Sequence, residues 1–97
     1  MREFMRGAVS LHILHHASSG EVHGAWMAEE LAGHGHEISP GTLYPMLHRM
    51  EREGMLASRR EVVDGRVLRL YRATSTGRRA LREAKKALRE LADELLR

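Results

Sequence analysis

Apolar positions recur at helical spacing in the first third of the chain. Within Phe4–Ala17, apolar side chains fall three or four positions apart, which predicts a first helix with one buried face. A shorter stretch, Trp26–Leu31, has the same kind of spacing and is followed by Gly33 and Gly35. It predicts a second helix that stops at these glycines.

A third helix is predicted to begin where Ser39 precedes Pro40, because serine caps helix N-termini and proline fits the first helical position. The residues expected to face the core are Leu43, Leu47 and Met50. Pro45 lies close enough to the start of this helix that we expect at most a slight kink. Gly54 is predicted to end it.

A β-hairpin and a long helix are predicted next. Leu56–Val63 and Val67–Ala73 are rich in strand-forming residues and flank Asp64-Gly65, a dipeptide favoured in tight hairpin turns. Thr74 then caps a helix that runs from about Ser75 to Arg97. Its apolar residues alternate at spacings of three and four: Leu81, Ala84, Leu88, Leu91 and Leu95.

This order of elements predicts a mainly α fold with a β-hairpin wing. Residues 1–74 are expected to form a winged helix-turn-helix domain for DNA binding, and residues 75–97 a C-terminal dimerisation helix. A helix of about 20 residues extends roughly 30 Å, which is longer than the core of so small a domain. Much of its apolar stripe therefore needs a second chain, and an identical chain is the simplest partner.

Composition narrows the class of protein. The chain has 97 residues, a net charge of +3 and no cysteine, which excludes disulfides, thiol catalysis and cysteine zinc sites. The sequence contains no apolar run of the roughly 18 residues that span a bilayer, and its N-terminus does not resemble a signal peptide. We therefore expect a cytoplasmic protein with no membrane partner.

Catalysis finds no support in the sequence. It contains no glycine-rich phosphate loop, no serine nucleophile elbow and no pair of carboxylates in an apolar segment. We expect neither an enzyme nor a cofactor.

The third helix has the layout of a helix that enters the major groove of DNA. Such a helix presents hydrogen-bonding groups at its first turn and cations further along. The candidates for base edges or nearby phosphates are Ser39, Thr42, Tyr44 and His48, and those for phosphates are Arg49 and Arg52. A capped helix with a solvated face would have similar residues, so this segment alone does not decide the function.

The charged residues of the hairpin are mostly arginine, which favours DNA as the partner. Arg59 and Arg60 are expected to meet backbone phosphates, whereas Arg66, next to the turn, is expected to reach a minor groove. Two alternatives remain. The charges could keep an exposed strand from pairing with other chains, and the helix and hairpin could together bind a protein rather than DNA.

Histidine is the other unusual feature. His12, His15 and His16 share a helical face at spacings suited to zinc or nickel, and His34 and His36 follow in a loop. No carboxylate is paired with the three in sequence, and exposed polar positions or interhelix hydrogen bonds explain them as well. We assign no metal ligands, and we keep a histidine-based, metal-responsive regulator as an alternative.

Several motifs resemble one known family. The stretch from Ser39 to Gly54 is similar, almost throughout, to the recognition-helix signature of PadR-type transcriptional regulators. Two further landmarks of that family follow the same order: His23-Gly24 before the second helix, and Tyr71-Arg72-Ala73-Thr74 with Gly77-Arg78 after the wing. The resemblance extends from about Gly7 to Leu81.

The resemblance implies a homodimer that binds an inverted-repeat operator in double-stranded DNA. It also implies a repressor released by a small-molecule effector or another signal, and the single final helix is similar to that of the short-form subgroup. Some relatives hold flat hydrophobic compounds between aromatic side chains of their final helices. The final helix of this chain has no aromatic residue, so that ligand mode is not expected.

Overall fold

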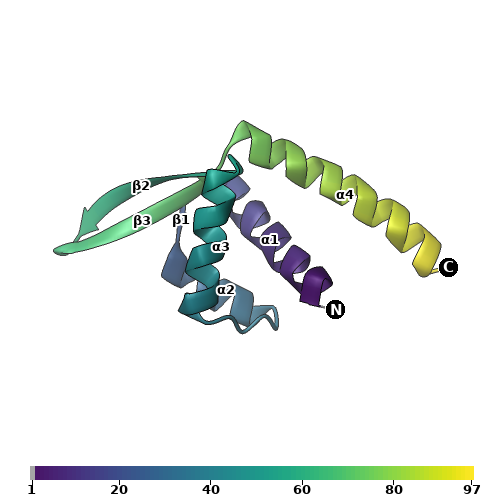
Figure 1. Ribbon diagram of the computed structural model, residues 1–97, viewed down its shortest axis with the longest axis horizontal. Helices are drawn as coiled ribbons and strands as arrows, with labels where there is room; N and C mark the ends of the chain where they lie inside the picture. The colour runs from purple at the N-terminus through teal and green to yellow at the C-terminus, as the bar shows by residue number, and fades with distance from the viewer. Residues whose placement is uncertain (1) are drawn as a thin grey trace.

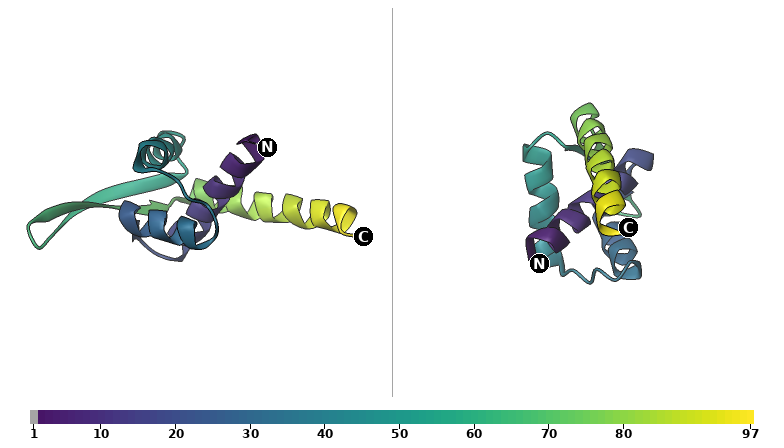
Figure 2. Two further views of the ribbon diagram at one scale, coloured as in Figure 1. Left: turned by 90° about the horizontal axis from the view of Figure 1, so that it is seen from below. Right: turned by 90° about the vertical axis from the view of Figure 1, so that its right-hand side faces the viewer.

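The computed structural model describes residues 2–97 and confirms the predicted winged helix-turn-helix fold with a long final helix. The elements follow the chain as α1 (Arg2–Ser19), β1 (Val22–His23), α2 (Gly24–Gly33), α3 (Pro40–Arg52), β2 (Leu56–Val63), β3 (Arg66–Ala73) and α4 (Ser75–Leu95). The hairpin and α4 project from opposite ends of the helical core, and the molecule is 53 Å long (Figures 1 and 2).

The start of α3 agrees with the prediction in position but not in detail. Ser39 is the N-cap residue with extended backbone, yet its hydroxyl caps no backbone N–H and instead donates to Thr42 Oγ1 at 3.2 Å. Pro45 lies inside the helix, which continues to Arg52. Its ring would crowd the carbonyl of Gly41 in the first turn, where little helix precedes it, so the helix is not broken.

The turn of the hairpin follows from its sequence. Asp64 and Gly65 both have positive φ, 52° and 76°, as the two central residues of a type I′ turn require. The strands pair in continuous register from Leu56↔Ala73 to Val63↔Arg66.

A third strand was not predicted. Val22 and His23 form β1, which pairs antiparallel with β3 and gives the sheet order β1-β3-β2. A two-residue strand has no periodicity, so its formation depends on the neighbouring strand. His23 also begins α2, because its Nδ1 accepts a hydrogen bond from the backbone N–H of Trp26 at 3.2 Å.

The core contains residues from every element except the short β1. Its largest fully buried side chains are Tyr71, Ile13, Met27, Leu31, Leu43, Leu47 and Leu56. Leu81 is also buried, so the first turns of α4 pack into the winged-helix domain. The predicted cap of α4 is confirmed, since Thr74 Oγ1 accepts a hydrogen bond from the backbone N–H of Gly77 at 3.0 Å. Among residues 2–97, every helix is too short or too polar to cross a lipid bilayer.

Candidate nucleic-acid interface

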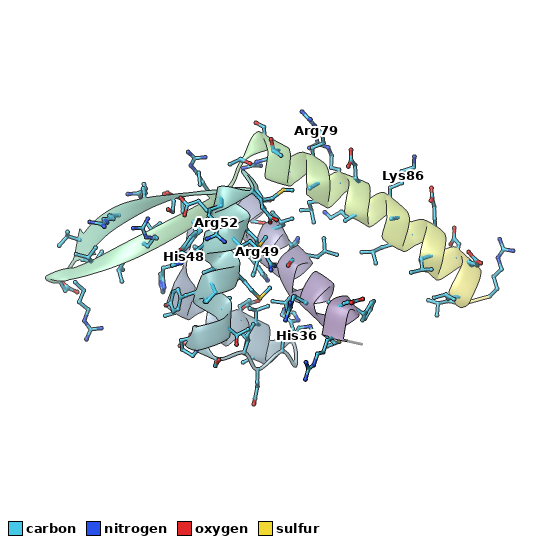
Figure 3. All side chains as sticks on the ribbon, viewed as in Figure 1. His36, His48, Arg49, Arg52, Arg79 and Lys86 are labelled. Atoms are coloured by element: carbon cyan, nitrogen blue, oxygen red, sulfur yellow. The ribbon has the colours of Figure 1, made fainter. Side chains whose placement is uncertain are left out.

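The outer face of α3 carries the polar residues predicted to contact DNA. Leu43, Leu47 and Met50 are buried, as predicted, and turn the other side of the helix to solvent. Of the residues predicted to contact DNA from this helix, Ser39, Thr42, Tyr44, His48 and Arg52 are exposed, and Arg49 is half-buried. His48, Arg49 and Arg52 all project from this helix (Figure 3).

Charge is distributed along α3 as an anion-binding helix requires. Its first turn has no acidic residue, and its last turn carries Arg49 and Arg52. The free backbone N–H groups and the dipole of a helix N-terminus favour a phosphate. Ser39 and Thr42 add two hydroxyls at the same end, already 3.2 Å apart. This end of α3 can therefore accept a phosphate without carrying a cation of its own.

Tyr44 is in part a packing residue. Its ring lies over Gly24 at the start of α2, so closely that a Cβ at Gly24 would be 2.6 Å from Tyr44 Cε1. The tyrosine nevertheless keeps 38% of its surface exposed. The ring therefore packs against the start of α2 and still presents part of its surface to solvent.

A hydrogen-bond relay joins α3 to the hairpin. Ser58 Oγ of β2 donates to Glu51 Oε2 of α3 at 2.7 Å, and Arg69 Nη1 of β3 donates to the same Ser58 Oγ at 2.9 Å. Arg69 was not among the predicted site residues. Arg69 reaches α3 through Ser58 of the neighbouring strand. The strand register would therefore be needed to identify Arg69 from the sequence.

The register divides the arginines of the hairpin between two faces. Cross-strand partners share a face, and faces alternate along each strand. Arg60 pairs with Arg69 on the face that carries the buried Leu56 and Tyr71 and meets α3. Arg59 pairs with Leu70 on the opposite face.

Arg59 is held by carboxylates on that second face. Its Nε and Nη2 donate to the two carboxylate oxygens of Glu21 at 2.6 and 2.8 Å, and Nη2 also reaches Glu61 at 3.2 Å. The hydrogen bonds from Arg59 lower the pKa of the Glu21 carboxyl, and the same bonds raise the pKa of Arg59. Arg66, the remaining predicted arginine, is exposed at the start of β3 beside the turn.

An apolar groove of about 790 Å³ separates α1 from the outer part of α4. Phe4, Leu88 and Leu91 line it and leave 61%, 45% and 46% of their surfaces exposed. Leu95, on the same stripe, is 68% exposed. The predicted apolar stripe of α4 is therefore divided: Leu81 is buried in its own domain, Ala84 is half-buried, and the three outer leucines face solvent.

Histidines gather elsewhere, between α1 and the C-terminal end of α2. His12, His16 and His34 come together there, whereas His15 is exposed. His12 and His15 also line the α1–α4 groove. Burial, followed by the neighbouring imidazoles, lowers the pKa of His12. Burial also lowers the pKa of His16, although Glu30 opposes the shift.

Comparison with known families gives a match over most of the chain. The profile described as the transcriptional regulator PadR-like family matches residues 13–83. Transcriptional regulator Rv3488 of Mycobacterium tuberculosis is 62% identical over 96 residues, which cover 99% of this chain and 90% of that protein. These are names of transcriptional regulators, in agreement with the expectation that the chain is not an enzyme.

Solved structures give the same fold. The PadR family transcriptional regulator from Eggerthella lenta is 32% identical with a TM-score of 0.85, covering 96% of this chain and 82% of that one. Bacillus subtilis PadR, solved in complex with operator DNA, is 20% identical with a TM-score of 0.72, covering 78% of this chain and 44% of that one. At that identity the second likeness concerns the fold alone.

Proposed function

Because the chain belongs to the PadR-like family of transcriptional regulators, we propose that it binds an inverted-repeat operator in double-stranded DNA as a homodimer and represses transcription. We further propose that an effector releases the protein from the operator. The cytoplasm, where a DNA-binding regulator meets the chromosome, remains its expected location.

The observation that carries the proposal is that two arginines of the hairpin lie on the same side of the molecule as α3. Arg60 and Arg69 lie opposite each other as like charges on the face that meets α3. Like charges in cross-strand pairs destabilise a sheet, and a bound phosphate would relieve their repulsion. A duplex with α3 in its major groove would offer such phosphates beside the groove.

The residues divide into two roles. We expect Ser39, Thr42, Tyr44 and His48 to contact base edges or nearby phosphates, since they lie at or near the N-terminal half of α3. We expect Arg49, Arg52, Arg60 and Arg66 to contact phosphates or, for Arg66, a minor groove. Arg59 is expected to contribute less to phosphate binding, because Glu21 holds its guanidinium on the opposite face. We add Arg69 to the residues expected to contact phosphates, because it lies on the same face of the hairpin as Arg60.

Dimerisation is supported by the apolar surface left on α1 and α4. Leu88, Leu91 and Leu95 stand in line on α4 and face solvent beside the exposed Phe4. Such a contiguous apolar surface usually marks an interface on a soluble protein. In a two-fold dimer each α4 would cover the groove of the other chain, and the two α3 helices would meet successive major grooves roughly 34 Å apart.

A titration of the purified protein with the DNA upstream of its own gene tests this function. Binding followed by fluorescence anisotropy at several salt concentrations should give a specific complex whose affinity falls steeply with salt. Arg52→Ala should weaken it, whereas Lys86→Ala on the outer side of α4 should not (Figure 3). If neither this DNA nor any duplex recovered from a random-sequence selection binds specifically, the alternative of a protein-binding module is favoured.

A further inference from the structure

Three histidines from two helices meet in space although they are separated in sequence. His12 and His16 stand one turn apart on α1, and His34 is the C-cap residue of α2. One ring nitrogen from each lies within 4.8 Å of the other two. This set differs from the one suggested by spacing, because His34 takes the place of His15.

The surroundings of the three rings add a negative charge. Glu30 Oε1 lies 3.7 Å from His16 Nε2 and 3.4 Å from His34 Nε2. The ring of His36 is 5.2 Å from that of His12, measured between ring centroids. Three converging imidazoles therefore lie between the two helices, with the Glu30 carboxylate beside two of them and the His36 ring beside the third.

Ring stacking accounts for part of this arrangement, since the His12 ring stacks on that of His34 and the His16 ring meets that of Trp26 edge-to-face at 5.3 Å between centroids. Within residues 2–97, no hydrogen bond fixes the rings of His12, His16 or His34, and Glu30 is the carboxylate that reaches two of them. The centroids of the His12 and His34 rings are only 5.0 Å apart. Imidazoles placed so closely repel when protonated, whereas a shared cation would hold them together.

We propose that His12, His16 and His34 bind a divalent transition-metal ion such as zinc, with Glu30 as the fourth protein group at the site. Imidazole is a preferred ligand of zinc, copper and nickel, and a carboxylate oxygen completes many such sets. Zinc–nitrogen bonds of about 2.1 Å place tetrahedral ligands roughly 3.4 Å apart. The three ring nitrogens now lie within 4.8 Å of one another, and small side-chain rotations at the partly exposed His34 would bring them to that separation.

The fold explains how such a site is built. The four-residue spacing on α1 puts His12 and His16 on one face, and α2 ends beside that face. Glu30 and His34 have the same spacing on α2, so each helix contributes a pair. Since metal binding requires no DNA, the proposal stands independently of the proposed operator binding.

Zinc titration of the untagged, metal-stripped full chain tests the proposal, because a histidine tag would itself bind zinc. Competition with a chromophoric zinc indicator should give one site per chain. His34→Gln and His16→Gln should each weaken zinc binding by at least roughly tenfold, the lower bound known for groups that merely support metal ligands. His15→Gln should bind zinc like the unchanged protein, because the His15 ring packs against that of His16 but is not one of the three converging imidazoles.

Thermal denaturation provides a second measurement that also checks folding. Zinc should raise the melting temperature of the unchanged protein and of His15→Gln, because an ion that binds only the folded state stabilises it. His34 is exposed, so His34→Gln should fold and lose this increase. The proposal is overturned if His15→Gln loses zinc affinity as much as His34→Gln, or if the unchanged protein does not bind zinc.

Discussion

Arg59 donates two hydrogen bonds to the carboxylate of Glu21, at 2.6 and 2.8 Å, across 38 positions of sequence. The pair joins β2 to the residue just before β1, on the face of the sheet opposite to α3. It holds the arginine away from the side on which Arg60 and Arg69 lie. An arginine that appears equivalent to its neighbour in sequence is therefore already partnered by a carboxylate.

Removal of this carboxylate should strengthen DNA binding. Glu21→Gln leaves Arg59 without its bidentate partner and removes a negative charge beside the wing, so both affinity and salt dependence should increase. Salt titrations of the two proteins on one operator duplex give the comparison. Glu90→Gln changes the net charge equally on α4 and serves as the control. Equal effects of both substitutions would mean that the Arg59 pair has no influence.

The hairpin arginines should differ in their contribution to DNA affinity. Arg60→Ala and Arg69→Ala should each lower the salt slope of binding by about one unit and weaken binding to all sequences, because each removes a phosphate contact. Arg59→Ala should have a smaller effect, since Glu21 already occupies its guanidinium. The measurement is the slope of log affinity against log salt concentration for each variant, on an operator duplex and on an unrelated duplex. An unchanged slope for Arg60→Ala and Arg69→Ala would contradict the proposed role of the α3-facing side.

Gly77 should be intolerant of any side chain. A Cβ there would lie 2.1 Å from the backbone oxygen of Met55, so Gly77→Ala must displace α4 from the hairpin and should cost about 2–4 kcal/mol of stability. Gly33→Ala at the end of α2 is the matched control, because a Cβ at Gly33 meets no atom within 4 Å and alanine favours a helix. Urea denaturation should separate the two variants in opposite directions. Equal stability of both would refute the packing argument.

Periodicity and turn chemistry were enough to predict most of the fold. The spacing of Leu43 and Leu47 identified the buried face of α3, and Asp64-Gly65 identified the hairpin turn. Both signals are local. The pairing of Val22 with Tyr71 is not, because it joins residues far apart in sequence, and β1 was missed for that reason.

The same limit applies to the two sites. The helical spacing on α1 indicated a group of histidines but could not show that His34, at the end of another helix, brings a ring nitrogen within 4.8 Å of those of His12 and His16. On the hairpin, counting positions outward from the turn would have paired Arg60 with Arg69. The contact between Arg59 and Glu21 needed the third strand, which the sequence did not reveal.

The outer leucines of α4 should govern dimerisation, whereas Leu81 should govern folding. Leu91→Asp places a charge on the 46% exposed position and should give folded monomers that bind the operator weakly, as analytical ultracentrifugation and anisotropy would measure. Val62→Asp makes the same kind of change, from an apolar to a charged side chain, at a 69% exposed position of the wing, and this variant should remain dimeric. Leu81→Ala should instead lose about 2–5 kcal/mol of stability, because it opens a cavity in the core. A dimer that survives Leu91→Asp would show that the groove between α1 and α4 is not the interface.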